Sequence, residues 1–363
     1  MGTRVDIIGW GGDGMAIVNA VVGIVARHED MWSVFRPSSE VSQLNATVRD
    51  AAIGDGASRC GADSAHGGPG LVVSEETDRL LRDALALAEA TGGTFNPLIG
   101  PLVAAWDVKA MRAAYVAGVP LPPAPAADAV EAASRASSWG LLSRVGEQRW
   151  AMGVPAESVG GVDVASPRLD LGGIAKGYTA DACRDLAVSM GARGVLVSVG
   201  TSSVSVFGTR ADGSSWRAGL RDPHGGPTSV AGVVELPAGG MSSLSTSGDN
   251  LGPLGRVGVG CAAERAAGST SDRRARETPR ETSVGGGRVF DHHIIDPRTG
   301  YPAHAGVRQV SVVASSGVLA EALSTALLVE PSIDVPDVVA RWARVTGTPA
   351  SAKVVGLVRA AQG

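Results

Sequence analysis

The chain has 363 residues, of which 44% are hydrophobic and 19% are charged, so it can form one large or two modest domains around a buried core. Its formal net charge is −4, and aromatic residues make up only 4% of it. These values argue against a nucleic-acid-binding protein, which needs a cationic face and, for single strands, aromatic rings that stack on bases.

The cysteines and the apolar segments limit the chain further. Cys60, Cys183 and Cys261 lie far apart and form no C-x-x-C pair, so the sequence predicts neither a disulfide framework nor a zinc site. No run of 18 apolar residues occurs, so we expect no membrane span. The first residues also lack the apolar core of a signal peptide, and as the sequence stands we expect a cytoplasmic protein.

The first part of the chain mixes predicted strands and helices. In chain order we expect a strand over 3–8, a helix over 14–30, a short helix after Ser38 or Ser39, a helix capped by Ser74, a short helix near 129–136 and hairpin strands over 141–145 and 149–153. The Gly/Ser/Asp-rich segment 54–70 and the Pro/Ala-rich segment 118–127 are predicted to be connectors. Prolines argue against a regular helix over 94–102.

The second part has the same mixed character. A helix is predicted from the Gly172-Gly173 turn to about residue 190, with further helices over 317–330 and near 334–346. Predicted strands cover 194–199, 203–208, 230–236, 241–246, 310–314 and 352–358. Segment 251–289 has no hydrophobic periodicity and is predicted to be a flexible surface insertion. The fold class expected is therefore α/β in the broad sense (α+β).

The segment from Asp170 to Lys176, with two glycines at its centre, favours an anion site. It is typical of a strand end, a tight glycine turn and a helix start, which exposes backbone N–H groups beside one mobile cation. A glycine turn with a solvated Lys176 is the simpler interpretation, and the residues alone leave both open.

Near the C-terminus, Glu321 and Thr325 lie four residues apart, so both project from one face of the predicted helix, and Ser324 is close enough to share it. Carboxylate and hydroxyl oxygens suit Mg²⁺. The alternative is an ordinary amphipathic helix with one solvated glutamate. The apolar neighbours argue against it, because a lone buried carboxylate is costly without a partner.

Two adjacent histidines precede the run Ile294-Ile295-Asp296-Pro297. On a strand their side chains would point in opposite directions, so one of the pair would face a site. A histidine near its free pKa suits a general base. On the residues alone, a structural histidine at a strand end is the favoured interpretation of His293.

Seven segments, in this order, resemble the ApbE family of FAD:protein FMN transferases: Met1-Gly2-Thr3, Ser38–Asn45, Gly92–Trp106, Leu169–Asp181, Thr246–Asp249, His293–Gly300 and Ala320–Thr325. The resemblance implies one domain over 1–363, in a two-lobed fold with mixed β-sheets flanked by helices and a central FAD cleft. It implies transfer of FMN from FAD to a serine or threonine of a target flavoprotein, with AMP released and Mg²⁺, or alternatively Mn²⁺, required. Family members are often exported lipoproteins.

The same resemblance implies roles for single residues. Lys176 and His293 are expected to be catalytic, with His293 taking the proton of the acceptor hydroxyl. The metal is expected at the Gly173 carbonyl, Glu321, Ser324 and Thr325. FAD contacts are expected from Met1, Phe35, Thr94, Phe95, Asn96, Asp170, Lys176 and Ile295.

Two alternatives to the transferase remain open at this point. The same site could use water as the nucleophile and hydrolyse FAD to FMN and AMP. The family usually has Asp at the positions of Asn96 and Glu321. Thr201 stands where the family usually has a second glycine after Gly200, and these three departures favour the second alternative, a non-catalytic FAD-binding protein.

Overall fold

A computed structural model describes residues 3–53, 70–155, 165–225, 228–236, 241–248 and 293–359. Its largest sheet has six strands in the order β1-β5-β6-β9-β10-β11. They are Val5–Trp10 (β1), Gly194–Val199 (β5), Ser203–Gly208 (β6), Met241–Gly248 (β9), Val307–Ala314 (β10) and Ala352–Arg359 (β11). The predicted bounds of β5 and β6 are confirmed.

Two smaller sheets complete the β structure of the described residues. One joins Leu71–Val72 (β2), Arg149–Met152 (β4) and Leu142–Gly146 (β3), and the other pairs Trp216–Arg221 (β7) with Val230–Leu236 (β8). Every strand pairing in the described part of the chain is antiparallel, so the expected mixed sheets are corrected to antiparallel ones. The architecture is α+β.

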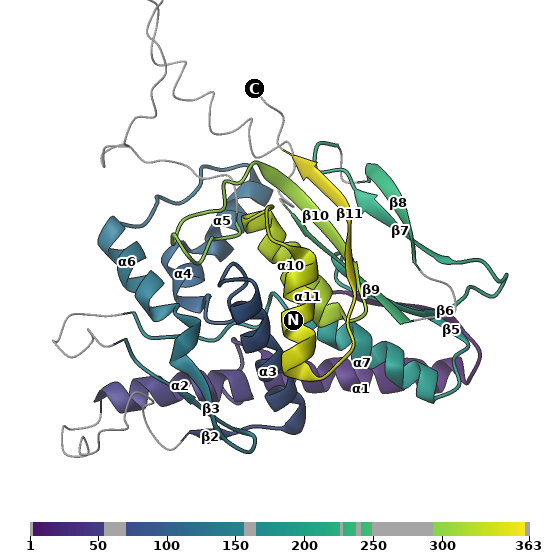
Figure 1. Cartoon of the computed structure of the whole chain (residues 1–363), viewed down its shortest axis with the longest axis horizontal. Coiled ribbons are helices and arrows are strands. Elements are labelled where there is room, and N and C mark those ends of the chain that lie inside the picture. Colours follow the sequence, from purple (N-terminus) through teal and green to yellow (C-terminus); the bar gives the residue numbers. More distant parts are fainter. Residues whose placement is uncertain are drawn as a thin grey trace, which may run out of the picture.

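Helices cover the large sheet and build the rest of the molecule. They are Gly14–Trp32 (α1), Glu40–Ile53 (α2), Glu75–Ala90 (α3), Gly100–Ala105 (α4), Val108–Ala117 (α5), Ala127–Ala136 (α6), Ala175–Ser189 (α7), Gly317–Val329 (α10) and Val335–Thr346 (α11), with a 3₁₀ turn at Trp139–Leu141. Figure 1 shows α10 between the large sheet and the part of the molecule that contains α3, α4 and α6, with α1 and α7 along the lower edge of the view.

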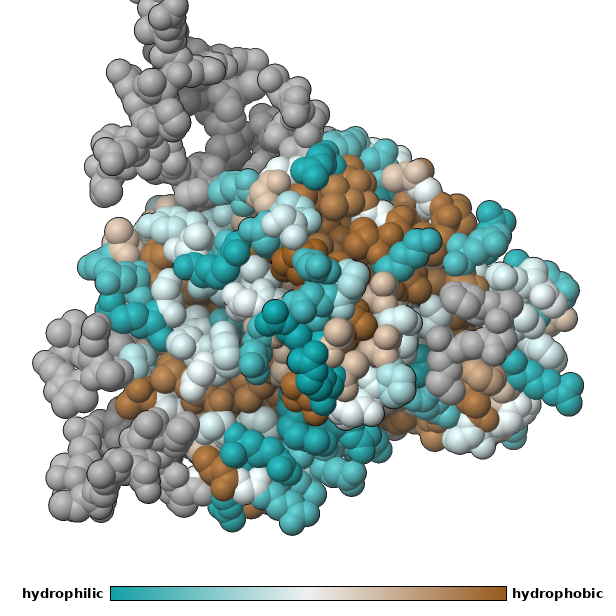
Figure 2. Space-filling model, viewed as in Figure 1, coloured by the Kyte–Doolittle hydropathy of each residue, from teal (hydrophilic) through white to brown (hydrophobic). Residues whose placement is uncertain are grey.

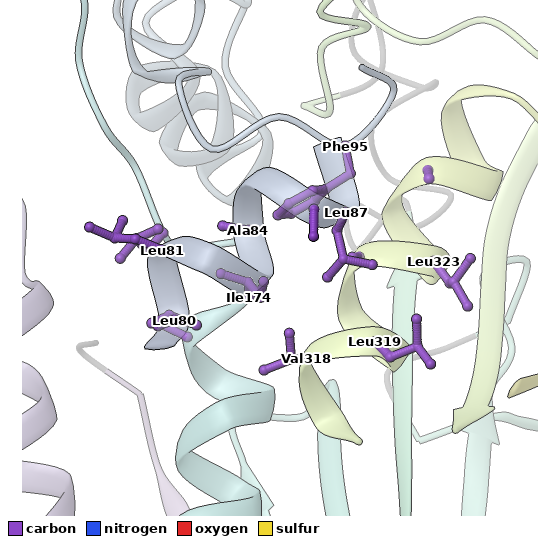
Figure 3. Packing of buried hydrophobic residues seen from close by; sticks show 14 of the residues in the cluster. Leu80, Leu81, Ala84, Leu87, Phe95, Ile174, Val318, Leu319 and Leu323 are labelled. Atoms are coloured by element: carbon purple, nitrogen blue, oxygen red, sulfur yellow. The ribbon is translucent and has the colours of Figure 1, made fainter. Parts of the chain in front are cut away.

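The largest hydrophobic cluster is centred on α10 and α3. Every residue of α10 except Thr325 is buried. Figure 3 shows Val318 of α10 on the side of that helix where Ile174 and α3 lie, with Leu319 and Leu323 on its other side, and all of these residues belong to one buried cluster. Burying such side chains stabilises the fold by roughly 1.5–3 kcal/mol each. The core therefore fixes α10 close to the turn that precedes α7.

Local signals explain where several helices begin. The Ser74 hydroxyl accepts the N–H of Thr77 at 3.3 Å, and the Ser39 hydroxyl accepts that of Ser42 at 3.0 Å, so both predicted caps are confirmed. The expectation of no regular helix over 94–102 is wrong at its end, because α4 begins at Gly100 with Pro101 in its first turn. Proline fits there because the first N–H groups of a helix have no intrahelical partner.

Some predictions fall outside the described residues, namely those on Met1, Cys60, most of 54–70, segment 251–289 and His292. Cys183 is fully buried, as expected of a small core residue. None of the helices in the described ranges is both long and apolar enough to cross a bilayer. Figure 2 shows a largely polar face, with apolar residues gathered where β10, β11 and the β7–β8 pair lie.

A buried histidine joins α1 to α7. The Thr179 hydroxyl donates to the carbonyl of Ala175 at 2.7 Å, so it accepts from Nδ1 of His28, which lies 2.9 Å away. Burial lowers the pKa of His28 from 6.5 to about 4, although Glu76 nearby acts in the opposite direction. The imidazole is therefore neutral in the folded protein at neutral pH.

This histidine predicts an acid-sensitive stability. The unfolded chain takes up a proton near pH 6.5, while folded His28 stays neutral down to about pH 4. The contribution of neutral His28 to the free energy of unfolding is therefore complete above pH 6.5 and is lost as the pH falls toward 4. We expect urea-unfolding midpoints to fall across this interval more steeply for the native chain than for His28→Phe. Parallel pH profiles for the two proteins would contradict the assignment.

Candidate functional site

A cavity of about 540 Å³ lies where the glycine turn, α7, α10 and the large sheet meet. Lys176, Glu321 and Thr325 line it together with hydroxyl groups at the ends of β6 and β9. Ile99, Val103 and Val108, from the α4–α5 region, form an apolar wall. This size and this mixture of apolar and convergent polar groups are typical of small-molecule sites.

The glycine turn is held from two sides. The amide of Asn45 on α2 donates to and accepts from the backbone of Leu169, at 3.1 and 2.7 Å. The carboxylate of Asp170 accepts the N–H of Gly172 at 2.8 Å, and its own N–H donates to the carbonyl of Pro97. Gly172 and Gly173 remain exposed at the cavity wall. The predicted turn and helix start are confirmed as structure.

The turn and α10 meet through one charge pair. The Lys176 ammonium lies 3.0 Å from Oε1 of Glu321 and donates to the carbonyl of Gly172 at 2.9 Å. Oε2 of Glu321 accepts the N–H of Gly177 at 2.9 Å, and the hydroxyl of Ser203 donates to Oε1. The Glu321 side chain is only 4% exposed, whereas Lys176 is 27% exposed, so the ammonium is the more accessible of these two cavity-lining groups.

Thr325 lines the cavity from α10 and is the one residue of that helix that is not buried. Its hydroxyl lies 3.0 Å from that of Ser247 on β9. Ser324 is fully buried, and its hydroxyl lies 2.8 Å from Ser247 and donates to the carbonyl of Glu321. Ser324 therefore points toward β9, and its expected part in holding a metal stays a prediction.

His293 lines the same cavity, together with Ile294 beside the apolar wall. The geometry therefore brings together Asp170, Gly173, Lys176, His293, Glu321 and Thr325, which the sequence places in three distant segments. This arrangement favours the functional interpretation of His293 over a purely structural one.

The expected FAD contacts from 94–96 are not in this wall. Thr94 and Phe95 are buried, and the Thr94 hydroxyl donates to the carbonyl of Thr91. The Asn96 amide donates to the carbonyl of Ser137 and accepts the N–H of Leu98, so it stabilises a turn. Phe95 packs behind the wall, where its ring would touch a Cβ added to Gly173. In this structure the three residues support the turn, and the cofactor contacts expected of them stay predictions.

Phe35 and Ile295 lie elsewhere as well. Phe35 is 78% exposed and lines a separate hollow with Asn45 and Arg168. Ile295 is 4% exposed and packs with Leu102 in another apolar cluster. The FAD contacts expected of both residues stay predictions, whereas Ile294, the neighbour of Ile295, lines the cavity.

Two residues that contribute to the site, Ser203 behind Glu321 and Arg112 at the cavity, carry no recognisable signal in the sequence. Ser203 meets Glu321 only because β6 lies beside β9 and under α10. Arg112 reaches the cavity from α5, a helix that the sequence analysis did not predict. A single serine on a strand or a single arginine on a helix forms no recognisable sequence motif. The position of Ser203 becomes clear only from the pairing of strands that are far apart in the chain.

The donor atoms fit a hard divalent cation. Mg²⁺ prefers oxygen ligands and usually combines one or two carboxylates with phosphate oxygens. The Glu321 carboxylate and the Thr325 and Ser247 hydroxyls meet that description. No group of three or more His, Cys, Asp or Glu side chains suited to a metal occurs within the described ranges.

The model of the ApbE family matches residues 1–258 and 269–346. This chain belongs to the ApbE family. Among relatives of this ApbE-family chain, the FAD:protein FMN transferase of Treponema pallidum is 31% identical over 322 residues, which are 86% of this chain and 71% of that protein. Those of Salmonella typhimurium and Rhodobacter capsulatus are 27% and 28% identical. The matches cover 74% and 91% of this chain, but 63% and 49% of those proteins.

Solved structures agree on the fold. The flavin transferase ApbE from Vibrio cholerae matches with a TM-score of 0.64 and 20% identity, over 99% of this chain and 94% of that one. The ApbE protein from Thermotoga maritima gives the same TM-score and coverage at 24% identity. At these identities the likeness establishes the ApbE fold.

Proposed function

We propose that this ApbE-family chain transfers the FMN part of FAD to a serine or threonine hydroxyl of an acceptor flavoprotein and releases AMP. The observation that carries the proposal is the Lys176–Glu321 pair, which joins the glycine turn to α10 inside one cavity that His293 also lines. The relatives named FAD:protein FMN transferase supply the reaction class.

Each end of the cavity suits one part of such a substrate. The Lys176 ammonium, which lines the cavity, attracts the diphosphate. The apolar wall of Ile99, Val103 and Val108 suits a flat ring system. Glu321, Thr325 and the Gly173 carbonyl are the groups that would hold Mg²⁺ or Mn²⁺, and such an ion stabilises negative charge on phosphate oxygens when it is bound.

The proposed step is a single displacement at phosphorus. The imidazole of His293 takes the proton of the acceptor hydroxyl, whose oxygen forms a bond to the phosphorus of the FMN half. The bond from that phosphorus to the AMP phosphate oxygen breaks, and AMP leaves with the electron pair. Lys176 places its positive charge against the phosphates throughout.

Incubating the protein with FAD, Mg²⁺ and candidate acceptor flavoproteins tests the proposal. Mass spectrometry should show FMN attached to the acceptor, and chromatography should show an equal amount of AMP. AMP and free FMN formed without an acceptor would favour hydrolysis instead, and tight FAD binding without any product would favour the non-catalytic alternative. A cytoplasmic location stays a prediction, which cell fractionation tests.

A further inference from the structure

The helices α7 and α10 touch through two glycines near their N-termini. A Cβ added to Gly177 would overlap the carbonyl oxygen of Gly317, and a Cβ added to Gly317 would overlap that of Gly177. Side chains cannot separate the two backbones at this crossing. The two helix starts therefore lie at a fixed distance, and any group that holds one of them also places the other.

Each helix start is bound by a carboxylate from the other helix. The N–H of Gly177 donates to Oε2 of Glu321 at 2.9 Å, and the N–H of Gly317 donates to Oδ2 of Asp181 at 2.7 Å. On its own helix, each carboxylate follows the glycine by four residues. We call these four residues, Gly177, Asp181, Gly317 and Glu321, the reciprocal clasp.

The clasp replaces ordinary N-caps. Ile174 precedes α7 and Ser316 precedes α10, and neither gives its helix a side-chain cap hydrogen bond among the described residues. The first N–H groups of a helix need acceptors, and its positive end favours negative charge. Asp181 and Glu321 supply both, each for the helix to which it does not belong.

Asp181 is tied into the fold by further bonds. Its Oδ1 accepts the hydroxyls of Ser205 on β6 and Ser243 on β9, at 2.7 and 2.6 Å, and pairs with Arg184 at 2.9 Å. Glu321 has matching partners in Ser203, two residues before Ser205 on the same strand, and in Lys176. Only Glu321 lines the 540 Å³ cavity, whereas Asp181 lines a separate hollow beside Arg184.

We propose that Asp181 is a positioning residue for the metal side of the site. It fixes the first turn of α10 to α7 and to the sheet. Glu321 and Thr325, one and two turns further along α10, are thereby aimed at the glycine turn. The inference rests on the proposed function, because it concerns the same cavity. Asp181 itself does not touch the substrate.

The test compares Asp181→Asn with Asp185→Asn. Asp185 lies on the same helix and also pairs with Arg184, at 2.8 Å, but its side chain is 53% exposed. For each protein, Mg²⁺ is titrated with and without FAD while the thermal midpoint is followed, and the Mg²⁺ dependence of FMN transfer is measured separately. We expect the half-saturating Mg²⁺ concentration to rise by about tenfold or more in Asp181→Asn, and to stay at the native value in Asp185→Asn.

A lower melting temperature with an unchanged Mg²⁺ titration would overturn the inference, since that is what a merely structural role gives. If Asp181→Asn does not fold, Ser205→Ala removes one of its supports, and the same titration should move in the same direction by less. An unchanged titration in that folded variant also overturns it. Failure of the native protein to respond to Mg²⁺ or to transfer FMN would instead overturn the proposed function.

Discussion

Glu321→Ala is expected to lower FMN transfer by at least about a hundredfold, because losing even a group that merely orients a metal ligand typically costs tenfold to a hundredfold. The substitution removes the acceptor of Lys176, Gly177 N–H and the Ser203 hydroxyl at once. Two of these donors lie in a buried environment, where each unmet hydrogen bond costs about 1–3 kcal/mol. Lys176 is 27% exposed and can turn to solvent, so its share of the stability loss is small.

The measurement is the rate of AMP release, with the thermal midpoint recorded for the same samples. Glu330→Ala is the matched control, because Glu330 lies at the C-terminal end of α10, away from the cavity. Glu321→Asp keeps the negative charge on a side chain that is one methylene shorter, so it separates the contribution of the charge from that of the carboxylate's position. A Glu321→Ala protein that transfers FMN at the native rate would show that the charge pair has no part in the reaction.

Gly317→Ala and Gly177→Ala are expected to be the most destabilising of the substitutions considered, with a loss of about 3 kcal/mol or more, or failure to fold. In each case the new methyl group would overlap backbone atoms of the facing helix, which cannot rotate away as a side chain could. The helices must then separate, and both carboxylate-to-backbone bonds of the reciprocal clasp are lengthened.

Gly23→Ala provides the comparison for this effect. Gly23 lies in the middle of α1, and an added Cβ there would meet no atom within 4 Å. Alanine is favoured over glycine in a helix interior by about 1 kcal/mol, so this variant should be as stable as the native chain or more stable. Urea unfolding of the three proteins measures the difference. Equal midpoints for Gly23→Ala and Gly317→Ala would mean that the helix crossing tolerates separation.

Local chemistry made much of this fold predictable. Neighbouring residues predict the Ser74 cap, the glycine turn at 172–173 and the alternating strands β5 and β6. The structure has each of them at the predicted position. The family resemblance pointed to Lys176, Glu321 and Thr325, which the structure brings to one cavity.

The errors have physical causes of two kinds. Pro101 argues against a helix in the sequence, yet proline fits the first turn of α4. The segments of α5 and β7 lack a clear apolar period. The partners of the carboxylates depend on contacts between residues far apart in the chain. Asp181 meets Gly317 across 136 positions, and no local pattern reports such a pairing.

The crossed glycines also bear on how this protein can be recombined with its relatives. Each helix supplies the carboxylate that accepts a backbone N–H at the start of the other helix. Segments 175–189 and 317–329 therefore depend on each other, even though they are separated in sequence. A chimaera that takes only one of these two helices from another family member combines two helix surfaces that belong to different proteins. Chimaeras that exchange both helices together should retain the reciprocal clasp, and with it the shape of the neighbouring cavity.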